Sequence, residues 1–97
     1  MLRDHIIEKL TQNFKPYYLE VEDFSERHKG HAGYGETGES HFAVVIVSDT
    51  FENLPRPARH RLVYDALSTE FTQTLHALRL KTMTRGEYDQ AAERERV

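Results

Sequence analysis

The 97-residue chain has no cysteine, no long apolar run and no large excess of charge of either sign. The absence of cysteine excludes disulfides, thiolate nucleophiles and metal sites made of thiolates alone. The longest apolar run, Phe42 to Val47, is far shorter than the roughly 20 residues that span a membrane. The formal charge of −3 gives no overall attraction to nucleic acid or to an anionic membrane, so such binding would need a local basic patch.

The size and composition favour one small domain. A chain of 97 residues with 38% hydrophobic content can build a single core, and a domain of this size has little stability to spare. The N-terminal stretch "MLRDHIIEKL" begins with mixed charges and lacks the apolar segment of a signal peptide, and no transit peptide precedes it. We therefore expect a soluble protein of the bacterial cytoplasm that does not associate with membranes.

The first half of the chain has the pattern of one helix and two strands. Apolar residues recur every four positions over residues 2 to 13, which predicts an amphipathic helix. Residues 17 to 26 begin with apolar and acidic side chains in alternation, as in a strand with one wet face. Residues 41 to 49, "HFAVVIVSD", are rich in β-branched side chains and predict a strand covered on both faces or nearly so.

The second half adds a helix, a strand and a polar tail. Pro57 suits the first turn of a helix, and apolar spacing continues that helix to about Thr74. Glu70 falls inside its apolar arc, so either the arc is narrower or the Glu70 side chain extends out to solvent. Residues 76 to 82 predict a third strand, and residues 85–97 form a polar tail with some helix propensity. The expected fold is α+β, in the order α-β-β-α-β, with a core over about residues 2–84.

This order gathers histidines at one end of the sheet. If the second and third strands are parallel, both begin at the same edge, where His41 opens one and His76 opens the other. The loop that contains His28 and His31 leads directly into His41. Neutral imidazoles bind transition metals and can replace cysteine in iron–sulfur clusters, although this spacing matches no zinc signature. The alternative for each single histidine is an ordinary hydrogen-bonded residue at or near the surface.

The loop over residues 27–40 is long for a compact domain, and loops of this length tend to be functional or disordered. Its glycines do not form a GxGxxG pattern and do not precede a helix, which argues against a phosphate cradle. The alternative is a mobile loop that orders only with a partner.

One basic cluster, made of Arg56, Arg59, His60 and Arg61, lies at the start of the main predicted helix. Arginines beside a helix N-terminus can hold phosphate oxygens, so this cluster is the candidate nucleic-acid contact. The competing interpretation is a solvated helix end, in which Arg61 pairs with Asp65 one turn later. No nucleophile lies beside a suitable base, and we therefore expect a protein that is not an enzyme.

Three blocks of the sequence resemble those of a known family. "GESHFAVVIVSDTFENL", "RHRLVYDAL" and "HALRLKTMT" are similar to the signature blocks of the BolA family, in the same order and at similar spacing, over about Tyr18 to Thr84. The resemblance implies a fold similar to the class II KH domain, with a three-stranded mixed sheet.

The resemblance also implies a function in iron–sulfur cluster trafficking or in iron and redox regulation. BolA proteins bind CGFS-type monothiol glutaredoxins and share a two-iron two-sulfur cluster with the glutaredoxin cysteine and glutathione. The BolA side supplies the histidine that opens the last strand, matched here by His76, and a ligand from the long loop, matched by His31 with His28 as the alternative. His41 lies in a family block where a structural role is implied. Alone, such a chain is expected to be a monomer or a weak homodimer.

Some members of the family are transcriptional regulators in stress responses, with DNA contacts attributed to the region "SDTFENLPRPARHRLVYDAL". Many members have a Gly-Lys pair where this chain has Asn53 and Leu54, and no GxxG loop is present. The first hypothesis is therefore an adaptor that uses His76 and His31, and the second is a DNA-binding regulator that uses Arg56, Arg59 and Arg61. A third is an interaction domain whose histidines bind nothing.

Overall fold

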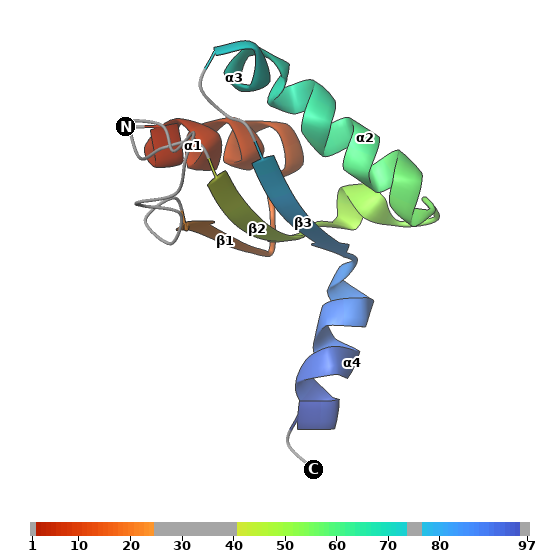
Figure 1. Ribbon diagram of the computed structural model, residues 1–97. Coiled ribbons are helices and arrows are strands. Elements are labelled where there is room, and N and C mark those ends of the chain that lie inside the picture. Colours follow the sequence, from red (N-terminus) through yellow and green to blue (C-terminus); the bar gives the residue numbers. More distant parts are fainter. Residues whose placement is uncertain (1, 25–40, 74–76, 96–97) are drawn as a thin grey trace.

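The computed structural model describes residues 2–24, 41–73 and 77–95 (Figure 1). The elements, in chain order, are α1 (Leu2–Phe14), β1 (Tyr18–Asp23), β2 (His41–Val47), the 3-10 turn η2 (Asp49–Phe51), α2 (Arg56–Ala66), α3 (Ser68–Gln73), β3 (Ala77–Met83) and α4 (Arg85–Glu95). The predicted α+β class is confirmed. The tail, whose helix propensity was noted in the sequence, forms the helix α4.

The three strands form one mixed sheet in the order β1-β2-β3. β1 is antiparallel to β2, with Val21 opposite Val44, and β2 is parallel to β3, with Val44 opposite Leu80. The helices α1, α2 and α3 lie together on one side of the sheet, whereas α4 projects away from the end of β3 (Figure 1). The parallel pairing confirms that β2 and β3 begin at the same edge.

The core lies between the sheet and the three helices. Alternate residues of β2 face the helices, and the side chains of Phe42, Val44 and Ile46 are almost completely buried. α1 contributes Ile6 and Leu10, which are one helical turn apart and fully buried. Burial of each such side chain contributes about 1.5–3 kcal/mol, so this layer is the main source of stability.

The other face of β2 is less covered than the sequence predicts. His41, Ala43 and Val45 are only half-buried on this face, and Val47 alone is fully buried. The prediction of a strand covered on both faces is therefore correct only at its C-terminal end. The reason is that α4, which could have covered this face, contacts the sheet only near the start of the helix, where the Tyr88 ring stacks on Tyr18.

The single helix predicted from Pro57 to about Thr74 is wrong, because the structure divides it at Leu67. The backbone of Leu67 leaves helical geometry, and its N–H contacts the carbonyls of both Val63 and Tyr64 as in a tightened last turn. Ser68 and Thr69 follow, two residue types with low helix propensity. The break lets α3 take its own orientation against α1 (Figure 1).

The carboxylate of Glu70 is buried within the core layer. Both expectations for this residue, a position outside the apolar arc and a side chain extended to solvent, are therefore wrong. Glu70 is 3% exposed. Its Oε1 accepts a hydrogen bond of 3.1 Å from Lys9 Nζ, and its Oε2 lies 3.3 Å from Nε2 of His5. Lys9 and His5 of α1 therefore contact this buried carboxylate, although more than half the chain separates them from Glu70 in sequence.

Candidate functional site

The edge where β2 and β3 begin is the place predicted for the histidine cluster. His41 opens β2 and lies opposite Ala77, the first residue of β3. Phe24, just after β1, donates its backbone N–H to the His41 carbonyl at 3.1 Å. The described ends of all three strands therefore meet at this edge. His28, His31 and His76 lie outside the described residues, in segments that join the chain at Phe24, His41 and Ala77.

His41 packs against an aromatic ring at this edge. Its imidazole lies 5.9 Å from the Phe24 ring in an edge-to-face arrangement, and the guanidinium of Arg79 lies 4.9 Å from the centre of the same ring. Such contacts hold rings in fixed orientations and add a positive charge beside them. Within residues 2–24, 41–73 and 77–95, no three His, Asp or Glu side chains are grouped as metal ligands would be. His41 is the one predicted metal-ligand candidate in those ranges.

The predicted arginine cluster is divided between two roles. Arg59 is mostly buried, with a side chain 13% exposed, and its Nε donates to the Leu54 carbonyl at 2.7 Å. Its Nη1 and Nη2 donate to the two carboxylate oxygens of Glu87 in α4, at 2.7 and 3.3 Å. Arg56 and Arg61 make no ion pair within the described part of the chain, and the expected pair between Arg61 and Asp65 is not formed there.

Glu87 also closes the first turn of α4. The backbone N–H of Thr84 donates to Glu87 Oε1 at 2.9 Å, and the N–H of Glu87 donates to Thr84 Oγ1 at 3.2 Å. This reciprocal pair is a capping box, and its sequence signal is "TRGE", which the prediction of a polar tail with some helix propensity did not use. The same carboxylate therefore starts α4 and, through Arg59, ties it to α2.

The pairing of Glu87 predicts a pH-dependent stability. The pKa of its carboxyl is lowered, chiefly by hydrogen bonds from Arg59 and then from the Thr84 backbone. Because the folded pKa is depressed, the stabilising contribution is fully present above the ordinary value of about 4.3 and is lost as the pH falls through the folded pKa. Solvent screening limits the contribution to about 1 kcal/mol, since the side chain is half exposed.

Glu87→Gln tests this effect, because glutamine keeps the capping hydrogen bonds and removes the charge. Urea unfolding is expected to show a deficit for the variant at neutral pH that disappears in acid. A deficit that stays constant as the pH falls would exclude a contribution from the carboxylate charge.

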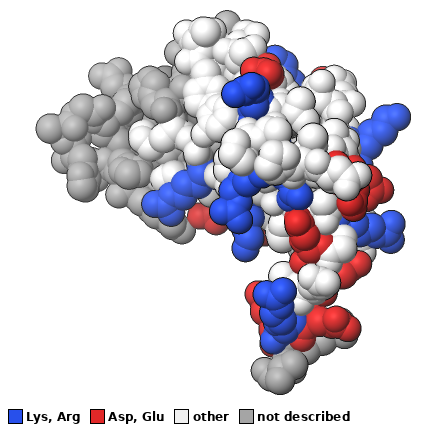
Figure 2. All heavy atoms as spheres, turned by 90° about the vertical axis from the view of Figure 1, so that its right-hand side faces the viewer, with Lys and Arg blue, Asp and Glu red and all other residues white. Residues whose placement is uncertain are grey.

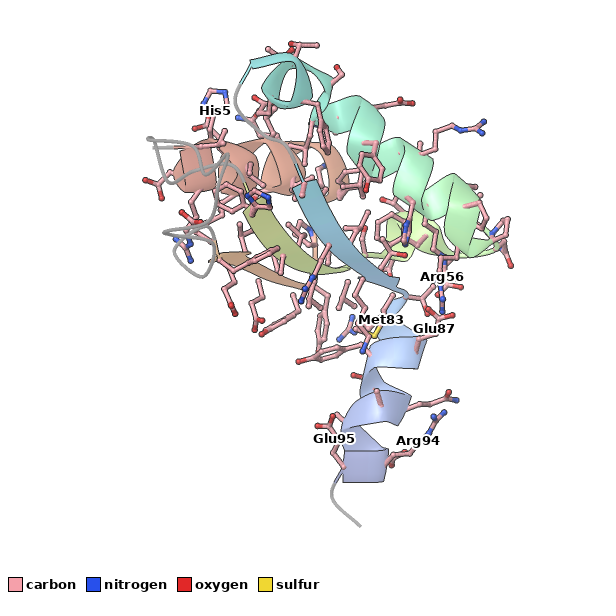
Figure 3. The ribbon with its side chains drawn as sticks, in the orientation of Figure 1. His5, Arg56, Met83, Glu87, Arg94 and Glu95 are labelled. Atoms are coloured by element: carbon pink, nitrogen blue, oxygen red, sulfur yellow. The ribbon has the colours of Figure 1, made fainter. Side chains whose placement is uncertain are left out.

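A groove lies between the start of α2, the end of β3 and one face of α4, with a volume of about 570 Å³. Figure 3 shows Arg56, Met83 and Glu87 gathered at this place. Its lining residues are Arg56, Arg59, His60, Leu80, Lys81, Thr82, Met83, Glu87, Gln90, Ala91 and Arg94. The pKa of His60 is lowered, first by burial and then by the charge of Arg56. The groove has no signal in the sequence, because its walls come from three separate elements.

Thr82, in the groove, has a buried hydroxyl without a partner, the only such side-chain oxygen or nitrogen atom found in the described ranges. A buried hydroxyl that makes no hydrogen bond is costly, and valine has nearly the same shape and a high preference for strands. Thr82→Val is therefore expected to raise the free energy of unfolding by about 1 kcal/mol, as measured by urea unfolding. Thr84→Val is the matched control, and it should destabilise because it removes the cap of α4. Destabilisation by Thr82→Val would show that the hydroxyl is satisfied.

No helix in the described part of the chain has the length and apolar character needed to cross a membrane.

The chain matches the family model described as "BolA-like protein" over residues 10–87. It is 46% identical over 89 residues to the "DNA-binding transcriptional regulator BolA" of Escherichia coli (strain K12), covering 92% of this chain and 81% of that protein. It is 45% identical over 86 residues to "SufE-like protein 1, chloroplastic/mitochondrial" of Arabidopsis thaliana, covering 84% of this chain but 23% of that longer protein.

Solved structures agree with the sequence matches. The "BolA domain of SufE1 from Arabidopsis thaliana" has a TM-score of 0.79 and 43% identity, with 89% of this chain and 94% of that chain covered. The "BolA1 protein from Mus musculus" has a TM-score of 0.77 and 32% identity, with 94% and 71% covered. Sequence blocks, topology and these matches agree, and the chain belongs to the BolA family.

Proposed function

We propose that this BolA-family protein is a non-enzymatic adaptor that binds a CGFS-type monothiol glutaredoxin. It supplies His76 and His31 to a two-iron two-sulfur cluster shared with the glutaredoxin cysteine and glutathione. The observation that carries the proposal is the convergence of the described ends of β1, β2 and β3 at one edge.

The covalent connections at this edge support the choice of ligands. His76 precedes Ala77, and Ala77 lies opposite His41 in the parallel pair. His76 is therefore the sequence neighbour of the first described residue at this edge. The segment over residues 25–40 starts next to Phe24 and ends next to His41, which are joined by a backbone hydrogen bond.

The donor chemistry of the chain fits a shared cluster. With no cysteine, the chain cannot hold an iron–sulfur cluster through thiolates, and the sulfur ligands must come from the partner and glutathione. Imidazole ligands make a cluster less electron-rich than thiolates do, and they make ligation sensitive to protonation near neutral pH. Such a cluster suits reversible transfer or sensing.

The test is anaerobic titration of a cluster-loaded CGFS glutaredoxin with this protein, followed by visible absorption, circular dichroism and molecular mass. A one-to-one complex with new visible bands is expected. His31→Ala and His28→Ala, compared in parallel, assign the loop ligand, and we expect the larger spectral change for His31. The proposal fails if wild-type protein forms no complex and leaves the glutaredoxin spectrum unchanged.

A DNA-binding regulator is the second candidate, because three relatives carry the name "DNA-binding transcriptional regulator BolA" at 36–46% identity. Arg56 and Arg61 would be its phosphate contacts, whereas Arg59 is already held by Glu87. Fluorescence anisotropy with duplex DNA should show affinity that falls with salt, and the slope should be smaller in Arg56→Gln and Arg61→Gln. The same affinity and slope in wild type and both variants would exclude these contacts.

A further inference from the structure

Three cationic side chains line the groove between α2, β3 and α4, and each comes from a different element. Arg56 belongs to α2, Lys81 to β3 and Arg94 to α4. On α4 the groove is lined by Glu87, Gln90, Ala91 and Arg94. The last three follow Glu87 by three, four and seven residues, so all four lie on one face of the helix. Figure 3 shows Arg94 on the side of α4 that carries Glu87, and Glu95 on the opposite side. Arg94 is therefore part of the groove wall.

The positive charge in this groove is not neutralised. Arg59 is paired with Glu87, but Arg56, Lys81 and Arg94 have no ion pair within the residues that the structure describes. Three uncompensated cations that line one groove make a local attraction for an anion, and this attraction is largest at low salt because the three residues are exposed.

We propose that this groove binds a small molecule that carries two or more phosphate groups. Arginine and lysine are the side chains that bind phosphate oxygens most strongly. The volume of about 570 Å³ is within the range of small-molecule sites. Leu80, Met83 and Ala91 supply apolar surface for the organic part of such a ligand.

The surrounding charges favour a compact anion over a nucleic-acid strand. Asp89, Glu93 and Glu95 lie on the other faces of α4, next to the groove in sequence and outside its lining. Figure 2 shows Asp and Glu side chains on the projecting helix, next to Lys or Arg side chains. A long polyanion that leaves the groove along α4 would meet these carboxylates, whereas a ligand confined to the groove would not.

The test is an NMR titration of the full chain with inorganic tripolyphosphate at low salt. Saturable shifts are expected at the amides around Arg56, Lys81 and Arg94. Lys81→Gln and Arg94→Gln should each weaken binding by on the order of tenfold, since each removes a charge-assisted hydrogen bond. Arg61→Gln removes the same charge from α2 outside the groove, and it should leave the affinity nearly unchanged.

His60 gives an independent readout. Its imidazole lines the groove beside Arg56, and its pKa is lowered first by burial and then by the charge of Arg56. Phosphate groups bound next to it should raise the pKa of His60, measured from its ring proton shifts with and without tripolyphosphate. The raised value should be absent in the double variant Lys81→Gln/Arg94→Gln.

Three results would overturn the proposal. Shifts scattered over all surface lysines and arginines, or an equal loss of affinity in Arg61→Gln, would show nonspecific attraction. Binding of a duplex DNA without binding of tripolyphosphate at equal phosphate concentration would assign the groove to nucleic acid. An unchanged pKa of His60 under saturating tripolyphosphate would place the ligand elsewhere.

Discussion

Replacement of His76 by alanine is expected to abolish the new visible absorption and circular dichroism bands of the complex with a CGFS glutaredoxin. Under the adaptor proposal, the substitution removes the ligand that this chain supplies next to Ala77. No cysteine is present to take its place. Because metal ligation and complex formation are linked, the heterodimer should also lose most of its stability. Reconstitution under anaerobic conditions with glutathione measures both effects.

His60→Ala is the matched control for this experiment. His60 lines the groove beside Met83, at the far end of β3 from Ala77. At about 3.3 Å per residue, six residues of strand separate these ends by roughly 20 Å. The control should give the wild-type spectrum. A wild-type spectrum in His76→Ala as well would remove this histidine from the cluster.

Lys9→Met is expected to lower the free energy of unfolding by about 2–3 kcal/mol. Removal of one partner from a buried ion pair leaves an uncompensated charge, which typically costs about 3–5 kcal/mol. The Glu70 side chain is only 4% exposed, but Lys9 is 31% exposed and His5 still contacts the second carboxylate oxygen. The expected loss of stability is therefore smaller than this typical cost. Urea unfolding monitored by circular dichroism measures the loss.

The double variant Lys9→Met/Glu70→Leu separates the charge effect from packing. It replaces the pair by apolar side chains, which is often neutral or stabilising, so most of the lost stability should return. If the double variant is as unstable as Lys9→Met, packing of the Lys9 chain explains the loss. If Lys9→Met alone is as stable as wild type, the pair contributes nothing.

Much of the fold could be predicted because it follows from local spacing. The four-residue recurrence of Ile6 and Leu10 predicts α1, and the β-branched run of β2 predicts its strand, since each pattern buries one face of one element. The helical segment between β2 and β3 allows a parallel pair, and the common edge was predicted on the condition that the pair is parallel.

The errors occur where distant residues decide the structure. The burial of Glu70 depends on α1, whose Lys9 and His5 lie more than 60 residues away and contact the two oxygens of its carboxylate. Arg59 was predicted as a free basic residue, and its partner Glu87 is 28 residues away in a segment interpreted as a polar tail. Helical periodicity contains no information on such pairs.

The candidate site also has a part that could be predicted from the sequence and a part that could not. Topology alone places His41 and the start of β3 at one edge, and the structure has this arrangement. The basic groove could not be predicted, because Arg56, Lys81 and Arg94 have no common periodicity and meet only when α4 is tied to α2.

The most direct measurement is pulsed EPR on the reduced cluster of the glutaredoxin complex, with ¹⁵N-labelled histidine in this chain only. Ligation by this chain predicts nitrogen hyperfine couplings whose frequencies change with the label and which disappear in His76→Ala. A cluster signal that is identical with labelled and unlabelled protein would show that no histidine of this chain binds iron, and would contradict the adaptor function.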